Sequence, residues 1–303
     1  MHALYLNHFG LREHPFTLTP DTSYFFSYGH YSNALNTLVV ALRTGEGFIK
    51  VTGEVGTGKT LLCRKLLNVL EEECVTAYIP NPLLSPSALT MAVAEELGLQ
   101  FARNIGAHRV LKLIVEQLIT LRRQGKSVVL CLDEVQAMPS ETLEAVRLLT
   151  NLETEKHKLL QVVMFGQPEL DQRLAHPAIR QLKQRISFAY TLKPIEADGL
   201  NAYVDHRLRV AGFSGAGLFS GAALRRIYRA SAGVPRLVNI LCHKALMVAY
   251  GRGERLVSTA AAQAAIRDTQ HSVLGGTRRW HLWPALGTAG VVVVGLAAAL
   301  LVG

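Results

Sequence analysis

One glycine-rich segment constrains the fold and chemistry of this chain more than any other feature. Residues 53–60 read Gly-Glu-Val-Gly-Thr-Gly-Lys-Thr and match the pattern G-x-x-x-x-G-K-[ST] at every fixed position. An apolar, strand-like run at 48–52 precedes the segment, and a helical pattern of leucines at 61–70 follows it. In this strand–loop–helix context, backbone N–H groups and a helix N-terminus close around phosphate oxygens. The segment therefore predicts a site for a nucleoside triphosphate.

The residues of this loop have separate expected roles. Lys59 is expected to reach the β- and γ-phosphates of ATP, and the hydroxyl of Thr60 is expected to be a ligand of Mg²⁺. A glycine-rich turn with an accidental Lys-Thr pair would lack the flanking strand and helix. The residues expected to contact the nucleotide are Gly53, Glu54, Val55, Gly56, Thr57, Gly58, Lys59, Thr60 and Leu61.

A second apolar run, at 128–132, ends in the two carboxylates Asp133 and Glu134. Ionised carboxylates at the end of a buried strand need a compensating cation, which bound Mg²⁺ supplies. We therefore expect Asp133 to hold Mg²⁺ together with Thr60, and Glu134 to orient and deprotonate the attacking water. Without a phosphate loop upstream, a solvated acidic turn would be an equal alternative.

Two later polar residues complete the expected catalytic set. Gln167 follows an apolar run at 160–166, so its amide is expected beside Glu134, where it can hold the water or a γ-phosphate oxygen. A turn residue before Pro168 is the alternative. Arg236 ends a Gly-Val-Pro-Arg sequence that opens a helix, and an arginine there can fold over the nucleotide. A surface arginine at a helix start is the competing interpretation.

The order of patterns along the chain predicts an α/β fold followed by a helical part. Apolar runs that alternate with helical patterns indicate a parallel sheet, with strands at 48–52, 76–79, 128–132, 160–165 and 188–192. After Pro194 only helical patterns follow, at about 196–210, 220–231, 235–250 and 258–269. The expected domains are an α/β nucleotide-binding domain with an N-terminal linker at 1–195, an all-helical lid at 196–270, a basic linker at 271–281 and a transmembrane helix at 282–302.

The segment 282–302 carries no charged residue. At 1.5 Å per residue, a helix of that length spans about 31 Å, which matches the core of a bilayer. Arg278, Arg279 and Trp280 come directly before it, where cytoplasmic and interfacial anchors are found. We expect a single-pass C-terminal anchor in the bacterial inner membrane, with the ATPase part in the cytoplasm.

Most of the net charge of +9 lies near the predicted lid and linker. Residues 196–280 hold twelve Lys and Arg but only five Asp and Glu. Beside a membrane segment this belt favours anionic lipid headgroups, at about 1 kcal/mol per basic residue near the surface. Nucleic-acid binding would also explain this excess of basic residues.

The four cysteines lack C-x-x-C spacing and the eleven histidines lack metal-binding spacing, so we expect free thiols and no metal site from them.

Taken in their order, these motifs resemble those of the AAA+ superfamily. The phosphate loop, the strand ending in Asp133 and Glu134, the polar Gln167 and the Gly-x-Pro-Arg sequence ending in Arg236 follow that family's order. The resemblance implies the AAA+ fold, a P-loop parallel sheet with a C-terminal all-helical lid. It also implies an ATP hydrolase that uses ATP and Mg²⁺.

Further motifs resemble the secretion ATPases of the ExeA/GspA type. They are Phe9-Gly10-Leu11, Pro15-Phe16, Thr19-Pro20-Asp21, Gly45-Glu46-Gly47-Phe48, Gly166-Gln167-Pro168-Glu169-Leu170 and Gln184-Arg185-Ile186. Within that group, residues 47–67 and 76–82 most resemble the ATPase of mannose-sensitive haemagglutinin (MSHA) type IV pilus biogenesis. ExeA/GspA proteins continue past the membrane into a periplasmic peptidoglycan-binding domain, whereas this sequence stops at Gly303. That difference favours the pilus-type relative or a shortened member.

The resemblance also implies an arginine finger, which one subunit supplies to the γ-phosphate held by its neighbour. Arg185 is the first choice and Arg180 the second, and a surface salt bridge is the alternative for either. A finger of this kind makes the active species a homo-oligomer.

The expected function is that of a membrane-tethered AAA+ ATPase. It would couple ATP binding and hydrolysis to biogenesis of a type IV (MSHA-like) pilus or a type II secretion apparatus. Its expected partners are copies of itself, inner-membrane assembly proteins and the anionic membrane, and residues around 16–26 are expected to help cap the adenine. A DNA-acting AAA+ ATPase, such as a transposition regulator or helicase loader, is the main alternative. The membrane segment argues against it and against nucleic acid as a partner. A third alternative is a nucleotide-dependent scaffold that hydrolyses almost no ATP, which the Asp133–Glu134 pair disfavours.

Overall fold

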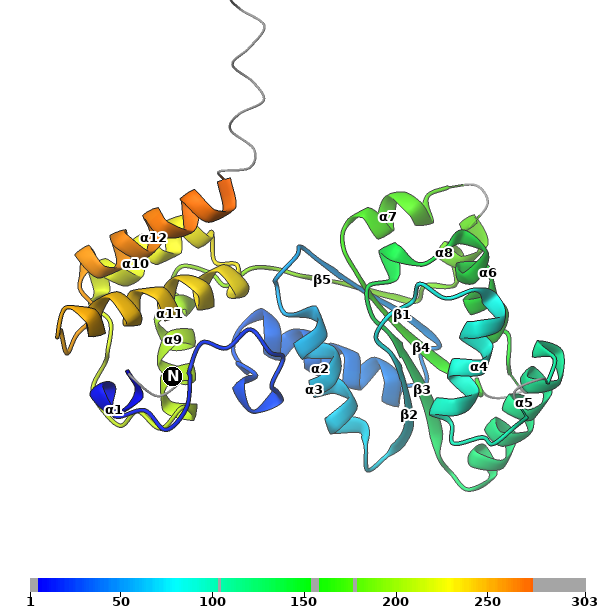
Figure 1. The fold of residues 1–303 in the computed structure, drawn as a ribbon. Coiled ribbons are helices and arrows are strands. Elements are labelled where there is room, and N and C mark those ends of the chain that lie inside the picture. The colour runs from blue at the N-terminus through cyan, green and yellow to red at the C-terminus, as the bar shows by residue number, and fades with distance from the viewer. Residues whose placement is uncertain (1–4, 103–104, 154–157, 177–178, 275–303) are drawn as a thin grey trace, which may run out of the picture.

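The computed structural model describes residues 5–102, 105–153, 158–176 and 179–274. These residues form two parts that lie side by side (Figure 1). One part is a β-sheet with helices on both faces. The other is a group of helices formed by the start of the chain and by its last third.

The sheet has five parallel strands in the order β2-β3-β4-β1-β5. The strands are β1 (Phe48–Gly53), β2 (Cys74–Ile79), β3 (Ser127–Leu132), β4 (Gln161–Gly166) and β5 (Phe188–Leu192). Because all five run in the same direction, the loops that follow them emerge along one edge of the sheet. The glycine-rich loop after β1 therefore opens beside the residues that follow β3 and β4.

The side chains of the interior strands alternate between two hydrophobic cores, as expected for strands buried on both faces. In β3, Val129 and Cys131 face the core that includes α2 (His30–Arg43) and α3 (Lys59–Leu70). Leu130, between them, faces the opposite core. That second core is closed by α4 (Pro86–Glu96), α5 (Ala107–Arg123), α6 (Ser140–Leu149), α7 (Glu169–Leu174) and α8 (Arg180–Arg185).

The helical part continues the first of these cores. It consists of α9 (Gly199–Val210), α10 (Gly221–Ser231), α11 (Pro235–Gly251) and α12 (Thr259–Leu274). The short α1 (Leu6–Phe9) joins it, because Arg12 N donates to Ala211 O at 2.8 Å and the ring of His8 hydrogen-bonds Glu254 O at 2.8 Å. The start of the chain is thus hydrogen-bonded to helices that lie about 200 residues later in the sequence. The segment that follows it must therefore return to the sheet.

The sequence predicted most of these elements. All five strands lie within two residues of their expected bounds, and α4 begins as expected, with Pro86 in its first turn and the Ser85 hydroxyl accepting from Ala88 N at 3.3 Å. All four cysteines are free thiols, as predicted. The helix expected at 196 begins instead at Gly199, and Glu196 pairs with the ring of His30 at 2.8 Å.

Two predictions concern the end of the chain. Residues 271–274, which were expected to begin the linker, instead continue α12, which ends at Leu274 and contains no Gly or Pro. The transmembrane helix expected at 282–302 lies outside the described residues. Within the described ranges, no helix is both long and apolar enough to cross a membrane.

Candidate functional site

The phosphate loop has the backbone conformation that its glycines allow. Gly56 and Gly58 have φ angles of 82° and 93°, which non-glycine residues rarely adopt. Gly58 caps the N-terminus of α3, so the first turn of that helix faces the space above the loop. Thr57 is fully buried beneath the loop, where its hydroxyl donates to Glu54 O at 2.8 Å. The glycines and the buried Thr57 thus give the loop its shape.

Lys59 is held inside the loop. Its ammonium donates to Gly53 O at 2.7 Å and to Glu54 O at 3.0 Å, and the residue is 5% exposed. Burial lowers the pKa of Lys59, although the nearby charges of Glu134 and Asp133 act in the opposite direction. Two backbone carbonyls are weak partners for a buried cation, so phosphate oxygens can replace them.

Thr60 and Asp133 form the next contact. The Thr60 hydroxyl donates to Asp133 Oδ2 at 2.7 Å, while Asp133 Oδ1 accepts from Glu134 N at 2.9 Å. Burial raises the pKa of Asp133, which is 2% exposed, so its ionised form lacks sufficient compensation. A hydroxyl and a carboxylate oxygen in direct contact are a donor set that Mg²⁺ prefers, and the pair fits that ion.

Glu134, Gln136 and Gln167 form a connected set of hydrogen bonds. Glu134 Oε2 accepts from Gln136 Nε2 at 2.5 Å and from Gln167 Nε2 at 3.2 Å. Gln136 Oε1 accepts in turn from the backbone N of Gln167 at 3.0 Å. Glu134 has a φ of 52°, a left-handed conformation that costs about 1–2 kcal/mol outside glycine. Strain at this residue is consistent with a functional constraint on its carboxylate.

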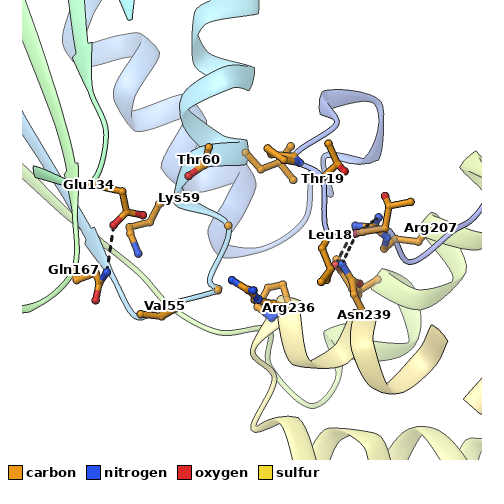
Figure 2. A pocket seen from close by; sticks show the side chains of 17 residues that line it. Leu18, Thr19, Val55, Lys59, Thr60, Glu134, Gln167, Arg207, Arg236 and Asn239 are labelled. Atoms are coloured by element: carbon orange, nitrogen blue, oxygen red, sulfur yellow. Dashed lines mark hydrogen bonds between the residues drawn. The ribbon is translucent and has the colours of Figure 1, made fainter. Parts of the chain in front are cut away.

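A pocket of about 320 Å³ runs from these residues to the segment Thr17–Pro20. Figure 2 shows Glu134, Gln167 and Lys59 at one end, and Leu18, Thr19 and Asn239 at the other. The volume is within the range of small-ligand sites. The walls come from the phosphate loop, from the start of the chain and from the helical part, so a ligand here would touch all three. The lining residues of the helical part are Tyr203, Arg207, Pro235, Arg236 and Asn239.

Arg236 reaches this pocket from the start of α11. Its backbone N donates to Gly56 O at 3.2 Å. A Cβ on Gly56 would lie 2.8 Å from Arg236 Cβ, so the loop and α11 approach as closely as a glycine permits. The helical part is thus in direct contact with the phosphate loop.

The structure brings most of the sequence-predicted residues together. Val55, Gly56, Gly58, Lys59, Thr60, Leu61, Glu134, Gln167 and Arg236 line the pocket. The carbonyls of Gly53 and Glu54 accept hydrogen bonds from the Lys59 ammonium, and Asp133 accepts one from the Thr60 hydroxyl. Arg185 and Arg180 do not line it. Arg185 lies at the end of α8, where it donates to Thr150 O at 3.4 Å, and Arg180 is exposed.

Several residues that line the pocket or contact its lining were not predicted individually. Gln136 stands two residues after Glu134, and that spacing was the available signal. Thr17–Pro20, from the segment expected to help cap the adenine, line the pocket, and the capping role stays a prediction. Tyr203 and Arg207 belong to a helix whose sequence carries no nucleotide-binding motif, and Asn239 lies one turn beyond the motif that ends in Arg236, so only their packing could reveal them.

Comparisons with known proteins agree with this geometry. Residues 42–174 match the family model described as AAA domain. Over 292 residues, 96% of this chain, the sequence is 40% identical to general secretion pathway protein A of Aeromonas hydrophila. The chain spans about half the length of that relative, 53%.

Several solved structures have a similar fold. The Cdc6p structure from Pyrobaculum aerophilum has a TM-score of 0.64 at 20% identity, and covers 82% of this chain and 71% of its own. The ORC2 protein of Aeropyrum pernix has a TM-score of 0.62 at 16% identity, with coverages of 80% and 68%. The RuvB branch migration motor of Thermotoga maritima has a TM-score of 0.55 at 14% identity, with coverages of 78% and 68%. At these identities the likeness shows the fold alone.

The matched AAA domain spans the phosphate loop, both carboxylates and Gln167, which the structure gathers at one edge of the sheet. Residues 42–174 therefore match an AAA domain whose phosphate loop and carboxylates form one site, and the chain is similar over nearly its whole length to general secretion pathway protein A of Aeromonas hydrophila.

Proposed function

We propose that this ATPase couples ATP binding and hydrolysis to assembly of an envelope machine, a type II secretion apparatus or a type IV pilus of the MSHA type. The observation that carries the proposal is the convergence of Lys59, Thr60, Asp133, Glu134 and Gln167 at one edge of the sheet. The relative named for general secretion supports the cellular role. The MSHA-like segments at 47–67 and 76–82 support the pilus.

Each side chain has a role that follows from its position. Lys59 exchanges its two carbonyl partners for β- and γ-phosphate oxygens of ATP. Glu134 accepts the proton of the attacking water, and Gln167, which already donates to it, holds that water in place. Arg236 lies between the loop and the helical part, so it can link the γ-phosphate to the position of α11.

Thr60 and Asp133 are the residues that would hold Mg²⁺. When bound, the ion supplies positive charge that neutralises the phosphate oxygens. Burial raises the pKa of Asp133, and a cation beside its carboxylate would favour the ionised form. Thr60 and Asp133, whose oxygens are in direct contact, would hold that ion together.

We further propose that the enzyme works as a homo-oligomer with Arg185 as the arginine finger and Arg180 as the alternative. Neither residue lines the pocket of its own chain, as a finger acting on a neighbour requires. Both precede β5, an edge strand that pairs only with β1. An edge leaves room for a second subunit.

We also propose that the chain is attached to the inner membrane through the uncharged segment 282–302. The basic residues at 278 and 279 would keep the preceding ATPase in the cytoplasm and contact anionic headgroups. Removal of 278–303 should leave a soluble protein with near-normal ATP affinity. If the shortened protein still fractionates with membranes in high salt, this attachment is wrong.

A DNA-acting role is the competing proposal, because the helical part is basic and the fold neighbours include an Aeropyrum pernix ORC1 protein in complex with DNA. That neighbour is only 19% identical to this chain, whereas the secretion relative is 40% identical. Salt-dependent binding of duplex DNA by the full chain would favour the DNA role.

The enzymatic part of the proposal is tested by two variants. Lys59→Ala should abolish ATP binding, because the loop loses its cation. Glu134→Gln should bind ATP with near-normal affinity and release no phosphate, because an amide cannot accept the proton. Equal loss of binding in both variants would contradict the separate roles. For the cellular part, the Glu134→Gln protein should block pilus or secretion assembly when produced beside the native enzyme.

A further inference from the structure

The end of the pocket farthest from Lys59 is formed by a segment without regular structure. Thr17, Leu18, Thr19 and Pro20 line it, and they lie between α1 and the short helix η1 (Thr22–Tyr24). A triphosphate bound at Lys59 would direct its nucleoside toward this end. The segment that the nucleoside would meet there contains no strand or helix, so side chains from other elements must hold the segment in place.

Arg207 of α9 supplies part of that support, and Arg64 of α3 supplies another part, since its Nη1 donates to Pro20 O at 3.2 Å. Arg207 Nε donates to Pro15 O at 2.5 Å, and Arg207 Nη2 donates to Thr17 O at 3.4 Å. The guanidinium carbon also lies 4.5 Å from the centre of the Tyr24 ring, in cation–π geometry. Arg207 is 4% exposed, yet each of these partners is uncharged. A buried guanidinium that donates hydrogen bonds to backbone carbonyls holds that part of the backbone in place.

A second bond to the same carbonyl comes from α11. Asn239 Nδ2 donates to Thr17 O at 3.4 Å, and Asn239 Oδ1 accepts from the Tyr203 hydroxyl at 2.9 Å. Arg207 Nη1 donates to that same hydroxyl at 3.3 Å. Asn239 stands three residues after Arg236, one helical turn along α11. The wall is therefore tied to the two helices that form the helical side of the pocket.

We propose that Arg207 is a positioning residue that holds the segment Thr17–Pro20 as the wall of the nucleoside end of the pocket. The inference rests on the proposed nucleotide site. Without the guanidinium, Pro15 O loses its donor and Thr17 O keeps only the bond from Asn239, so the segment is held less firmly against the pocket. Contacts to the base and ribose then weaken, while the phosphate contacts at Lys59 and Thr60 remain.

Two ligands separate these effects: ATP, which uses both ends of the pocket, and inorganic tripolyphosphate, which has no nucleoside. In Arg207→Met, the dissociation constant of ATP measured by calorimetry should rise at least about tenfold, whereas that of tripolyphosphate should change less than about twofold. Arg209→Met is the matched control, because Arg209 is exposed on the same helix. It should leave both constants unchanged.

A milder variant covers the case in which Arg207→Met does not fold. Tyr203→Phe removes only the hydroxyl that Arg207 and Asn239 share, and it should also weaken ATP more than tripolyphosphate. Equal losses for the two ligands, or no loss of ATP affinity, in folded variants would overturn the role of Arg207. Native protein that binds neither ligand would overturn the nucleotide site as well. Native protein that binds both equally would overturn only the nucleoside wall.

Discussion

Gln136 joins Glu134 to Gln167 through both ends of one amide. Its Nε2 donates to Glu134 Oε2 at 2.5 Å, and its Oε1 accepts from Gln167 N at 3.0 Å. An amide fixed at both ends allows its partners little freedom. The orientation of the Glu134 carboxylate is therefore set by a residue outside the pocket lining, which also fixes the backbone that presents the Gln167 amide.

We predict that Gln136→Leu slows catalysis without weakening ATP binding. The change keeps the size of the side chain and removes both hydrogen bonds, so Glu134 loses its alignment. The kcat should fall about tenfold to a hundredfold, the range expected for a misplaced catalytic group, while the Kd of ATP stays within about twofold. Gln172→Leu, at an exposed position on α7, is the control. An unchanged kcat in folded Gln136→Leu would contradict the role.

A second prediction concerns the junction between the sheet and the helical part. Gly233 has a φ of 74°, and a Cβ there would lie 2.0 Å from Ile195 O, while Ile195 N donates to Gly233 O at 2.9 Å. Gly233→Ala should therefore lower the free energy of unfolding by about 2–4 kcal/mol, through both strain and collision. Gly253→Ala is the matched control, since Gly253 has a φ of 71° but open space around its Cβ position. Gly253→Ala should lower the free energy of unfolding, measured by chemical denaturation, by only about 1–2 kcal/mol.

A third prediction concerns pH. His243 of α11 hydrogen-bonds the Tyr5 hydroxyl at 3.0 Å, and the ring of His14 bonds the same hydroxyl at 2.8 Å. Burial, followed by repulsion from His14, lowers the pKa of His243, and burial raises the pKa of Tyr5 to about 12. A histidine with a lowered pKa in the folded state resists protonation, so the unfolded chain binds the proton first as pH falls. Stability should therefore fall as pH drops below the usual histidine value of about 6.5.

Denaturation at about pH 7.5 and about pH 5.5 measures this loss. His243→Asn keeps a side chain that can bond Tyr5 but does not titrate, so the difference between the two pH values should shrink. It should not vanish, because burial also lowers the pKa of His206. An undiminished difference in His243→Asn would contradict the assignment.

The sequence predicted the residues that line the Lys59 end of the pocket because their motifs are local. The glycines of residues 53–60 determine the backbone conformation of that loop. Because parallel strands all end at the same edge of a sheet, Asp133 and Glu134 could be expected at the edge where the loop lies. Arg207 could not be predicted in this way. Its partners lie about 190 residues earlier and are backbone carbonyls, which leave no trace in side-chain patterns. The end of α12 was expected near residue 269, whereas the residues from His271 to Leu274 continue the helix.

The last prediction concerns Arg185, which ends α8 just before the edge strand β5 and lies outside the pocket of its own chain. If Arg185 completes a neighbour's site, Arg185→Ala should bind ATP normally and hydrolyse it at least about tenfold more slowly. A mixture with Lys59→Ala should then recover activity, because a Lys59→Ala subunit supplies the finger to the intact pocket of an Arg185→Ala subunit. The same mixture made with Arg180→Ala tests the alternative finger. A mixed oligomer of verified composition that recovers no hydrolysis with either variant would rule out a finger acting between subunits.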